Sequence, residues 1–189
     1  ARVSQGHIGR ARYIATNEEV RSHRSTILNL PLQLATIADA FKAAQILVDL
    51  ATAQANAQSE ARDEKEVAAL QEAYGKGATG RGMATGGAKA VKELEKEQKS
   101  RATRMIRDSI DGALLDIATF FRDVMMVQAG AADSLINTDM AEQITAYAHK
   151  TTPHSTVRKV NAIMKARTHL SHNAAPLLTC EALMCQIAN

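Results

Sequence analysis

Glycine and lysine stand together at Gly75-Lys76, a pair that also occurs in phosphate-binding loops. Such a loop needs an earlier glycine at fixed spacing, a Ser or Thr directly after the lysine, and a preceding strand. Here Tyr74 precedes the pair, Gly77 follows it, and no strand is expected nearby. The spacing therefore favours a flexible loop at residues 75–87, which holds six glycines, over nucleotide binding.

Histidine and cysteine gather near the end of the chain, where they could suggest zinc. His169 and His172 precede Cys180 and Cys185, without the closely spaced ligand pairs of structural zinc sites. On one helix the two cysteines point about 140° apart, so they neither share a metal nor form a disulfide. Two buried thiols in a reducing compartment, the cytoplasm, are the simpler interpretation. We expect no metal and no cofactor.

Basic residues are dense from Lys96 to Arg107, and they could contact phosphates. No aromatic side chains stand among them to stack on bases, and glutamates intervene, which favours a solvated helix face. No Ser, His and Asp set has the spacing of a catalytic triad. The sequence therefore indicates a protein that is not catalytic on its own.

The composition predicts an all-α fold, so any functional residues must be positioned by helices. Hydrophobic residues make up 46% of the chain and aromatic residues only 3%, with three prolines and a net charge of +3. Ala, Leu and Met favour helices. No apolar run is long enough to cross a membrane. The first residue is Ala1, and we expect the sequence to be part of a longer protein.

Two long antiparallel helices and three shorter ones are expected. The first long helix runs from Pro31 with an apolar stripe, and the second spans about Ala88 to Gln128. The 75–87 loop joins them as the tip of a projecting hairpin. The shorter helices begin at three predicted caps, given by Asp139 with Glu142, Thr152 before Pro153, and Asn173. Asn17 caps an earlier helix that ends near Leu30.

The last of these helices is apolar on most of its sides. Leu177, Leu178, Leu183 and Met184 cannot all point into one core at helical spacing. We therefore expect at least one of these four residues to be exposed in the isolated chain and to form a partner interface.

The segment from Ser4 to Arg12 resembles the start of the last lid helix in AAA+ clamp-loader subunits. Aligning Gly6 and Ala11 puts Gly9 where ATP-hydrolysing members have the sensor-2 arginine, a departure shared by delta-prime subunits. Residues 170–184 resemble the element that closes many collar domains, with Ala175 in place of its second Asn. Residues 88–124 resemble the long collar helix, and the charged start after a glycine-rich insertion is similar to actinobacterial versions.

The resemblance implies the C-terminal part of a bacterial DNA polymerase III clamp-loader subunit of delta-prime type. Residues 1–30 would be a remnant of the AAA+ lid, and residues 31–189 the helical collar (oligomerisation) domain. Collar partners would be the delta and gamma/tau subunits. Primed DNA, the sliding clamp and the ATPase sites would belong to the intact assembly, the DNA polymerase III holoenzyme.

Two alternatives stay open from the residues alone. One is a stand-alone helical nucleic-acid-binding or adaptor module that uses the hairpin tip. The other is a small helical enzyme or metal protein. Zinc titration and mixing with partner subunits distinguish the three classes.

Overall fold

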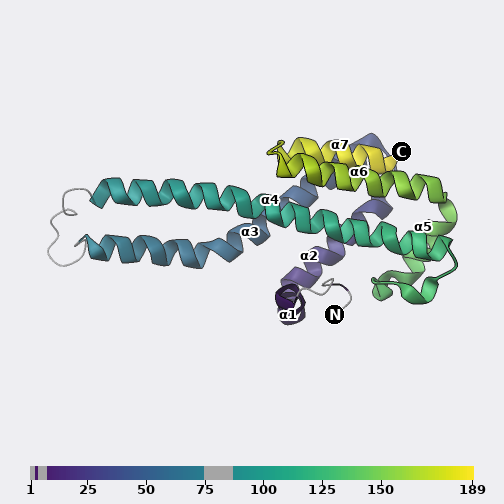
Figure 1. Cartoon of the computed structure of the whole chain (residues 1–189), viewed down its shortest axis with the longest axis horizontal. Helices are drawn as coiled ribbons and strands as arrows, with labels where there is room; N and C mark the ends of the chain where they lie inside the picture. Colours follow the sequence, from purple (N-terminus) through teal and green to yellow (C-terminus); the bar gives the residue numbers. More distant parts are fainter. Residues whose placement is uncertain (1–2, 4–7, 75–86) are drawn as a thin grey trace. The chain divides into compact units, whose positions relative to one another are not determined.

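The computed structural model describes residue 3, residues 8–74 and residues 87–189, and every regular element in these residues is a helix (Figure 1). This confirms the predicted all-α class. The chain divides into two compact units. Unit 1 comprises residues 1–50 and 110–189, and unit 2 comprises residues 51–109. Most of the predicted loop at residues 75–87 lies outside the described residues, as do Ser4 to His7.

Unit 1 begins with α1 (Ile8–Thr16) and α2 (Glu18–Asn29). The side chain of Asn17 accepts a hydrogen bond from the amide of Val20 at 3.3 Å, which confirms the predicted cap. Glu18 and Glu19 follow in the first turn, where carboxylates oppose the positive end of the helix dipole.

The first long helix, α3 (Ile37–Ala73), does not begin at Pro31. Residues Leu30–Gln33 form the short 3-10 helix η2, which includes the proline. Thr36 and Asp39 then cap α3 reciprocally. The Asp39 amide donates to Thr36 Oγ1 at 3.2 Å, and the Thr36 amide donates to Asp39 Oδ2 at 2.8 Å. A Thr-x-x-Asp box, which the sequence shows, therefore sets the start of α3.

The buried face of α3 also differs from the predicted stripe. Ile37 and Phe41 are exposed, whereas the buried positions are mostly small (Ala40, Ala43, Ala44, Leu47, Ala51 and Ala55). The stripe predicted from the sequence comprises Leu34, Ile37, Ala38, Phe41, Ala44, Val48 and Ala51. It is confirmed at Ala44 and Ala51, which are buried, and it is wrong at Ile37 and Phe41.

The second long helix, α4 (Gly87–Gln128), has the bounds that the sequence predicts. Its unit 1 part supplies five of the twelve largest fully buried side chains among the described residues. Phe120 and Phe121 are both fully buried, although they are adjacent in the chain. Their rings meet edge to face at 5.2 Å between centroids, and Tyr147 lies within 5.8 Å of both.

In unit 2 the second half of α3 and the first half of α4 lie side by side (Figure 1). Gln98 Nε2 donates to the Glu66 carboxylate at 3.2 Å, and Arg101 Nη2 donates to the Asp63 carboxylate at 2.7 Å. The two segments run antiparallel in Figure 1, as predicted. The hydrogen bond from Arg101 is the main reason that the pKa of Glu66 is lowered.

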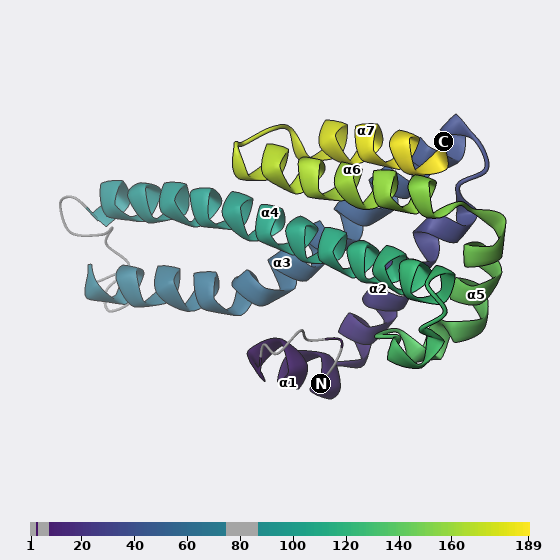
Figure 2. The same cartoon turned by 45° about the vertical axis from the view of Figure 1, so that its right-hand side comes forward.

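Three shorter helices complete unit 1: α5 (Ala141–Lys150), α6 (Pro153–Ser171) and α7 (Pro176–Ala188). α6 and α7 lie side by side in both views (Figures 1 and 2). The predicted cap at Thr152 is confirmed, since its side chain accepts from the Ser155 amide at 3.2 Å. The predicted box of Asp139 with Glu142 is wrong. Asp139 lies in the 3-10 helix η4 (Thr138–Met140), and no side chain caps α5.

Asn173 does not cap α7, whose first flanking residue is Ala175 without a side-chain hydrogen bond. It lies instead just beyond the end of α6, with a φ of 64°. The amides of Asn173 and Ala174 donate to the carbonyls of Leu170 and His169 at 3.1 and 3.0 Å. This is the Schellman arrangement, in which a left-handed residue closes a helix.

Candidate interaction surface and pocket

The four residues predicted to form an interface lie on different sides of α7. Leu183 and Met184 are fully buried, Leu177 is half-buried, and Leu178 is 67% exposed. The structure therefore brings only Leu178 and part of Leu177 to the surface. One exposed leucine among the four is what the spacing predicts, but Leu183 and Met184 serve the core of unit 1.

The outward side of α7 carries no charge along its centre. Leu178, Ala182 and Cys185 follow one another at four- and three-residue steps, so they share one side of the helix. Leu178 and Ala182 are exposed and Cys185 is half-buried, while Glu181 lies at the border. We call Leu178, Ala182 and Cys185 the outer α7 row. It is a small, uncharged and mainly apolar surface that faces solvent.

α6 supports α7 from one side and is anchored to α4. Arg167 donates two hydrogen bonds to the Asp111 carboxylate, from Nε at 2.7 Å and from Nη2 at 2.9 Å. This hydrogen-bonded pair raises the pKa of Arg167. Bidentate pairs of this kind fix orientation as well as adding energy. This pair therefore fixes α6, which packs beside α7, to the long helix α4.

The helical spacing of Val157, Val160, Met164 and Leu170 predicts an inward face of α6, which the structure bears out only at Leu170. Val157 and Met164 are instead 46% and 38% exposed. The buried positions are Thr156, Lys159, Ile163, Ala166 and Leu170. These residues do keep the three- and four-residue steps of a buried face. A threonine and a lysine among them disguise the periodicity, because both types are usually exposed.

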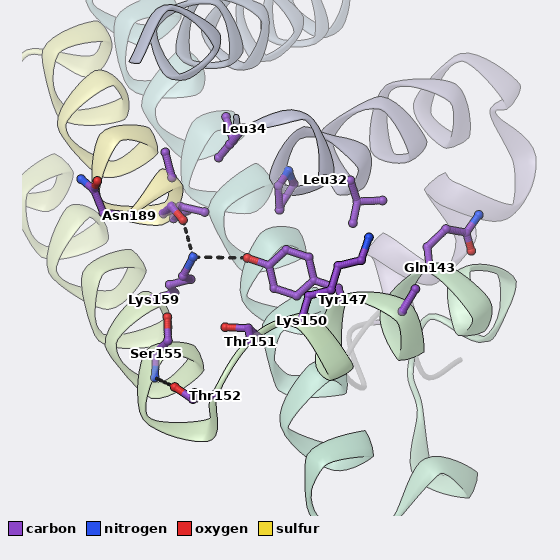
Figure 3. Close-up of a pocket in the computed structure, with 14 residues that line it drawn as sticks. Leu32, Leu34, Gln143, Tyr147, Lys150, Thr151, Thr152, Ser155, Lys159 and Asn189 are labelled. Atoms are coloured by element: carbon purple, nitrogen blue, oxygen red, sulfur yellow. Dashed lines mark hydrogen bonds between the residues drawn. The ribbon is translucent and has the colours of Figure 1, made fainter. Parts of the chain in front are cut away.

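Lys159 lies at the edge of a surface pocket of about 650 Å³ in unit 1 (Figure 3). Its ammonium donates to the phenol oxygen of Tyr147 at 3.3 Å and to the carbonyl of Ile187. The Ile187 carbonyl belongs to the last turn of α7, where carbonyls lack partners within the helix. Lys159 therefore ties α6 to the end of α7 and to α5 at once.

Burial changes the ionisation of both members of this pair. Desolvation lowers the pKa of Lys159, with a smaller contribution from the nearby positive charge of Arg158. Desolvation also raises the pKa of Tyr147. Each shift disfavours the charged form of its group. None of the residues that line the pocket is acidic, so the pocket suits a group that accepts hydrogen bonds. The residues that line it are Pro31, Leu32, Leu34, Gln143, Ala146, Tyr147, Lys150, Thr151, Thr152, Ser155, Lys159, Ile187, Ala188 and Asn189.

The predicted cysteines lie on separate sides of α7. Cys180 is fully buried, and burial raises the pKa of its thiol to about 12, with a smaller effect from Glu181. Cys185 belongs to the outer α7 row, and both thiols are free. Within residues 8–74 and 87–189, no group of three or more His, Cys, Asp or Glu side chains could hold a metal ion. In the same residues no helix is long and apolar enough to cross a bilayer.

The described residues of unit 1 thus present a helical surface with an open pocket beside Tyr147 and Lys159. Residues 105–187 match the family model described as DNA polymerase III, delta subunit, C terminal. This stretch, which covers less than half of the chain, takes in the second half of α4 and almost all of α5 to α7. It is similar to the C-terminal region of a DNA polymerase III clamp-loader subunit. No curated protein and no solved structure matches the chain.

Proposed function

We propose that this chain is the C-terminal oligomerisation part of a bacterial clamp-loader subunit of delta-prime type. Its role is to hold its subunit in a collar with the delta and gamma/tau subunits, in the cytoplasm, during replication. The family match over residues 105–187, whose description names the delta subunit, supports a clamp-loader subunit. The delta-prime type is supported only by the resemblance of residues 4–12, with Gly9 at the sensor-2 position. Loading of the sliding clamp on primed DNA belongs to the whole assembly, and this part performs no reaction of its own.

Residues 1–30 are, in this proposal, what remains of an AAA+ lid and its linker helix, and residues 31–189 form the collar. Gly9, in α1, stands where ATP-hydrolysing relatives of the resembled family carry an arginine. The proposed subunit would therefore take part in the assembly without hydrolysing ATP.

The outer α7 row is the part of the collar that we assign to a neighbouring subunit. An apolar side chain gains about 25 cal/mol for each Å² of apolar surface that binding removes from water. Leu178 is the largest exposed side chain of the row, and Leu177 lies at its border. Leu183 and Met184 support this surface from within, because they fill the core directly behind it.

Leu178→Asp tests the assignment in the full chain. The variant should fold as the wild type does, because residue 178 is already exposed, and it should lose co-purification with the delta and gamma/tau subunits. A carboxylate in an apolar interface is left without partners. Ile8→Asp is the matched control, since it puts the same charge at another exposed apolar position, in α1.

Retention of the complex by Leu178→Asp would exclude α7 as the collar interface. Failure of the wild-type chain to join any clamp-loader subunit would instead favour the stand-alone adaptor. A delta subunit restores a loader that lacks delta, whereas a delta-prime subunit restores a loader that lacks delta-prime. Reconstitution of each incomplete loader with this chain, followed by size-exclusion chromatography, distinguishes these two types.

A further inference from the structure

The contacts of unit 2 define which side of α4 faces α3. Gln98 and Arg101 both reach across to Asp63 and Glu66, so the side of α4 that carries residues 98 and 101 is turned to the partner helix. Leu94 and Met105, on the same side, are half-buried. At 100° for each residue, positions 92, 96 and 99 all lie on the half of the helix opposite this side.

Lysines occupy that outward side in a row. Lys92, Lys96 and Lys99 are spaced by four and three residues, and all three are exposed. Lys89 continues the row one turn earlier, but its ammonium lies 4.0 Å from the carboxylate of Glu93. Among the described residues, no carboxylate lies within ion-pair distance of Lys92, Lys96 or Lys99. We call these three residues the lysine row.

The glutamates of this stretch are displaced to the flanks of the row. In an α-helix Glu93 and Glu97 fall on one flank and Glu95 on the other. The sequence alone mixes acids and bases, which suggested an evenly solvated face. A continuous helix separates them into a cationic line with acidic borders.

We propose that the lysine row binds the phosphate backbone of double-stranded DNA without sequence preference. From Lys92 to Lys99 the helix rises about 10 Å, which matches about three phosphates of one strand. The net charge of the chain is only +3, so the attraction must come from this local arrangement. Side chains that stack on bases are missing from the row, which makes the backbone, and not the bases, its ligand.

Fluorescence anisotropy with a labelled 20-base-pair duplex tests the proposal on the full chain. If three phosphates are neutralised, affinity should fall about 40-fold between 50 and 200 mM salt. The triple variant Lys92→Gln, Lys96→Gln, Lys99→Gln should bind at least about tenfold more weakly at 50 mM salt and should lose most of this salt dependence.

A matched control removes three other exposed lysines, all in unit 1, as Lys42→Gln, Lys150→Gln, Lys165→Gln. Its net charge equals that of the first triple variant, and its affinity should stay within about twofold of the wild type. Equal losses in both variants would show attraction by net charge alone and overturn the proposal. Competition by poly-glutamate as strong as that by unlabelled duplex, at equal charge, would assign the row to an acidic protein instead. Absence of binding by the wild type at 50 mM salt would also overturn it.

Discussion

Arg24 Nε donates to Asp116 Oδ1 at 3.2 Å, and neither side chain is more than 10% exposed. The same guanidinium donates from Nη2 to the side-chain oxygen of Asn137. Asn137 in turn donates from its backbone and its side chain to Asp123, at 2.7 and 2.9 Å. This network joins α2, α4 and the segment before α5 within unit 1. It connects the predicted lid remnant to the predicted collar.

Arg24→Met should lower the free energy of unfolding by about 1.5–3 kcal/mol, because it removes the buried hydrogen bonds of the guanidinium to Asp116 and Asn137. Urea denaturation followed by circular dichroism measures the change. Arg158→Met removes the same charge from an exposed position of α6 and should stay within about 0.5 kcal/mol of the wild type. A loss below about 1 kcal/mol for Arg24→Met would mean that the network contributes little to the stability of unit 1.

Asn173→Ser distinguishes a left-handed residue from a helix cap. Serine is as good as asparagine at the start of a helix, so the variant would be neutral if Asn173 capped α7. At a φ of 64° serine lacks the tolerance of asparagine, and we expect a loss of about 1 kcal/mol in unfolding free energy. Asn173→Gly should equal or exceed the wild type in stability, since glycine adopts this conformation freely. A neutral serine variant would contradict the Schellman turn.

The long elements could be predicted because their signals are local. α4 keeps helical periodicity for 42 residues, and the Asn17 and Thr152 caps lie within three residues of the amides they bind. The errors arose where neighbours far along the chain decide. Asp116 and Asn137 stand 92 and 113 residues from Arg24, and no local pattern predicts that pairing.

The candidate site was predicted less completely for the same reason. Leu178 follows from the apolar circumference of α7, a local property. Leu183 and Met184 could not be separated from it, since spacing alone does not say which side of a helix the core covers. Lys159 was missed because a lysine inside an apolar face becomes favourable only when the Ile187 carbonyl and the Tyr147 phenol, 28 and 12 residues away, are brought to it.

Lys159 lies against the end of α7, and burial lowers the pKa of its ammonium below the ordinary lysine value of 10.5. Between that lowered pKa and 10.5 the unfolded chain binds more protons than the folded chain. The contribution of this group to stability therefore rises with pH through that window. Tyr147 has the opposite effect, because its raised pKa makes stability fall as pH rises above the ordinary tyrosine value of 10.0.

We expect the difference in unfolding free energy between the wild type and Lys159→Met to shift in favour of the wild type as pH rises toward 10. Below the lowered pKa the lysine is charged in both states, so its desolvation cost is present in full and the difference is flat. Urea denaturation from about pH 7 to 10 measures this profile, and placing Tyr147→Phe in both proteins removes the opposing titration. Lys165→Met, at an exposed position of the same helix, should show no such slope. A wild-type minus Lys159→Met difference that is independent of pH would mean that the ammonium of Lys159 is solvated in the folded protein.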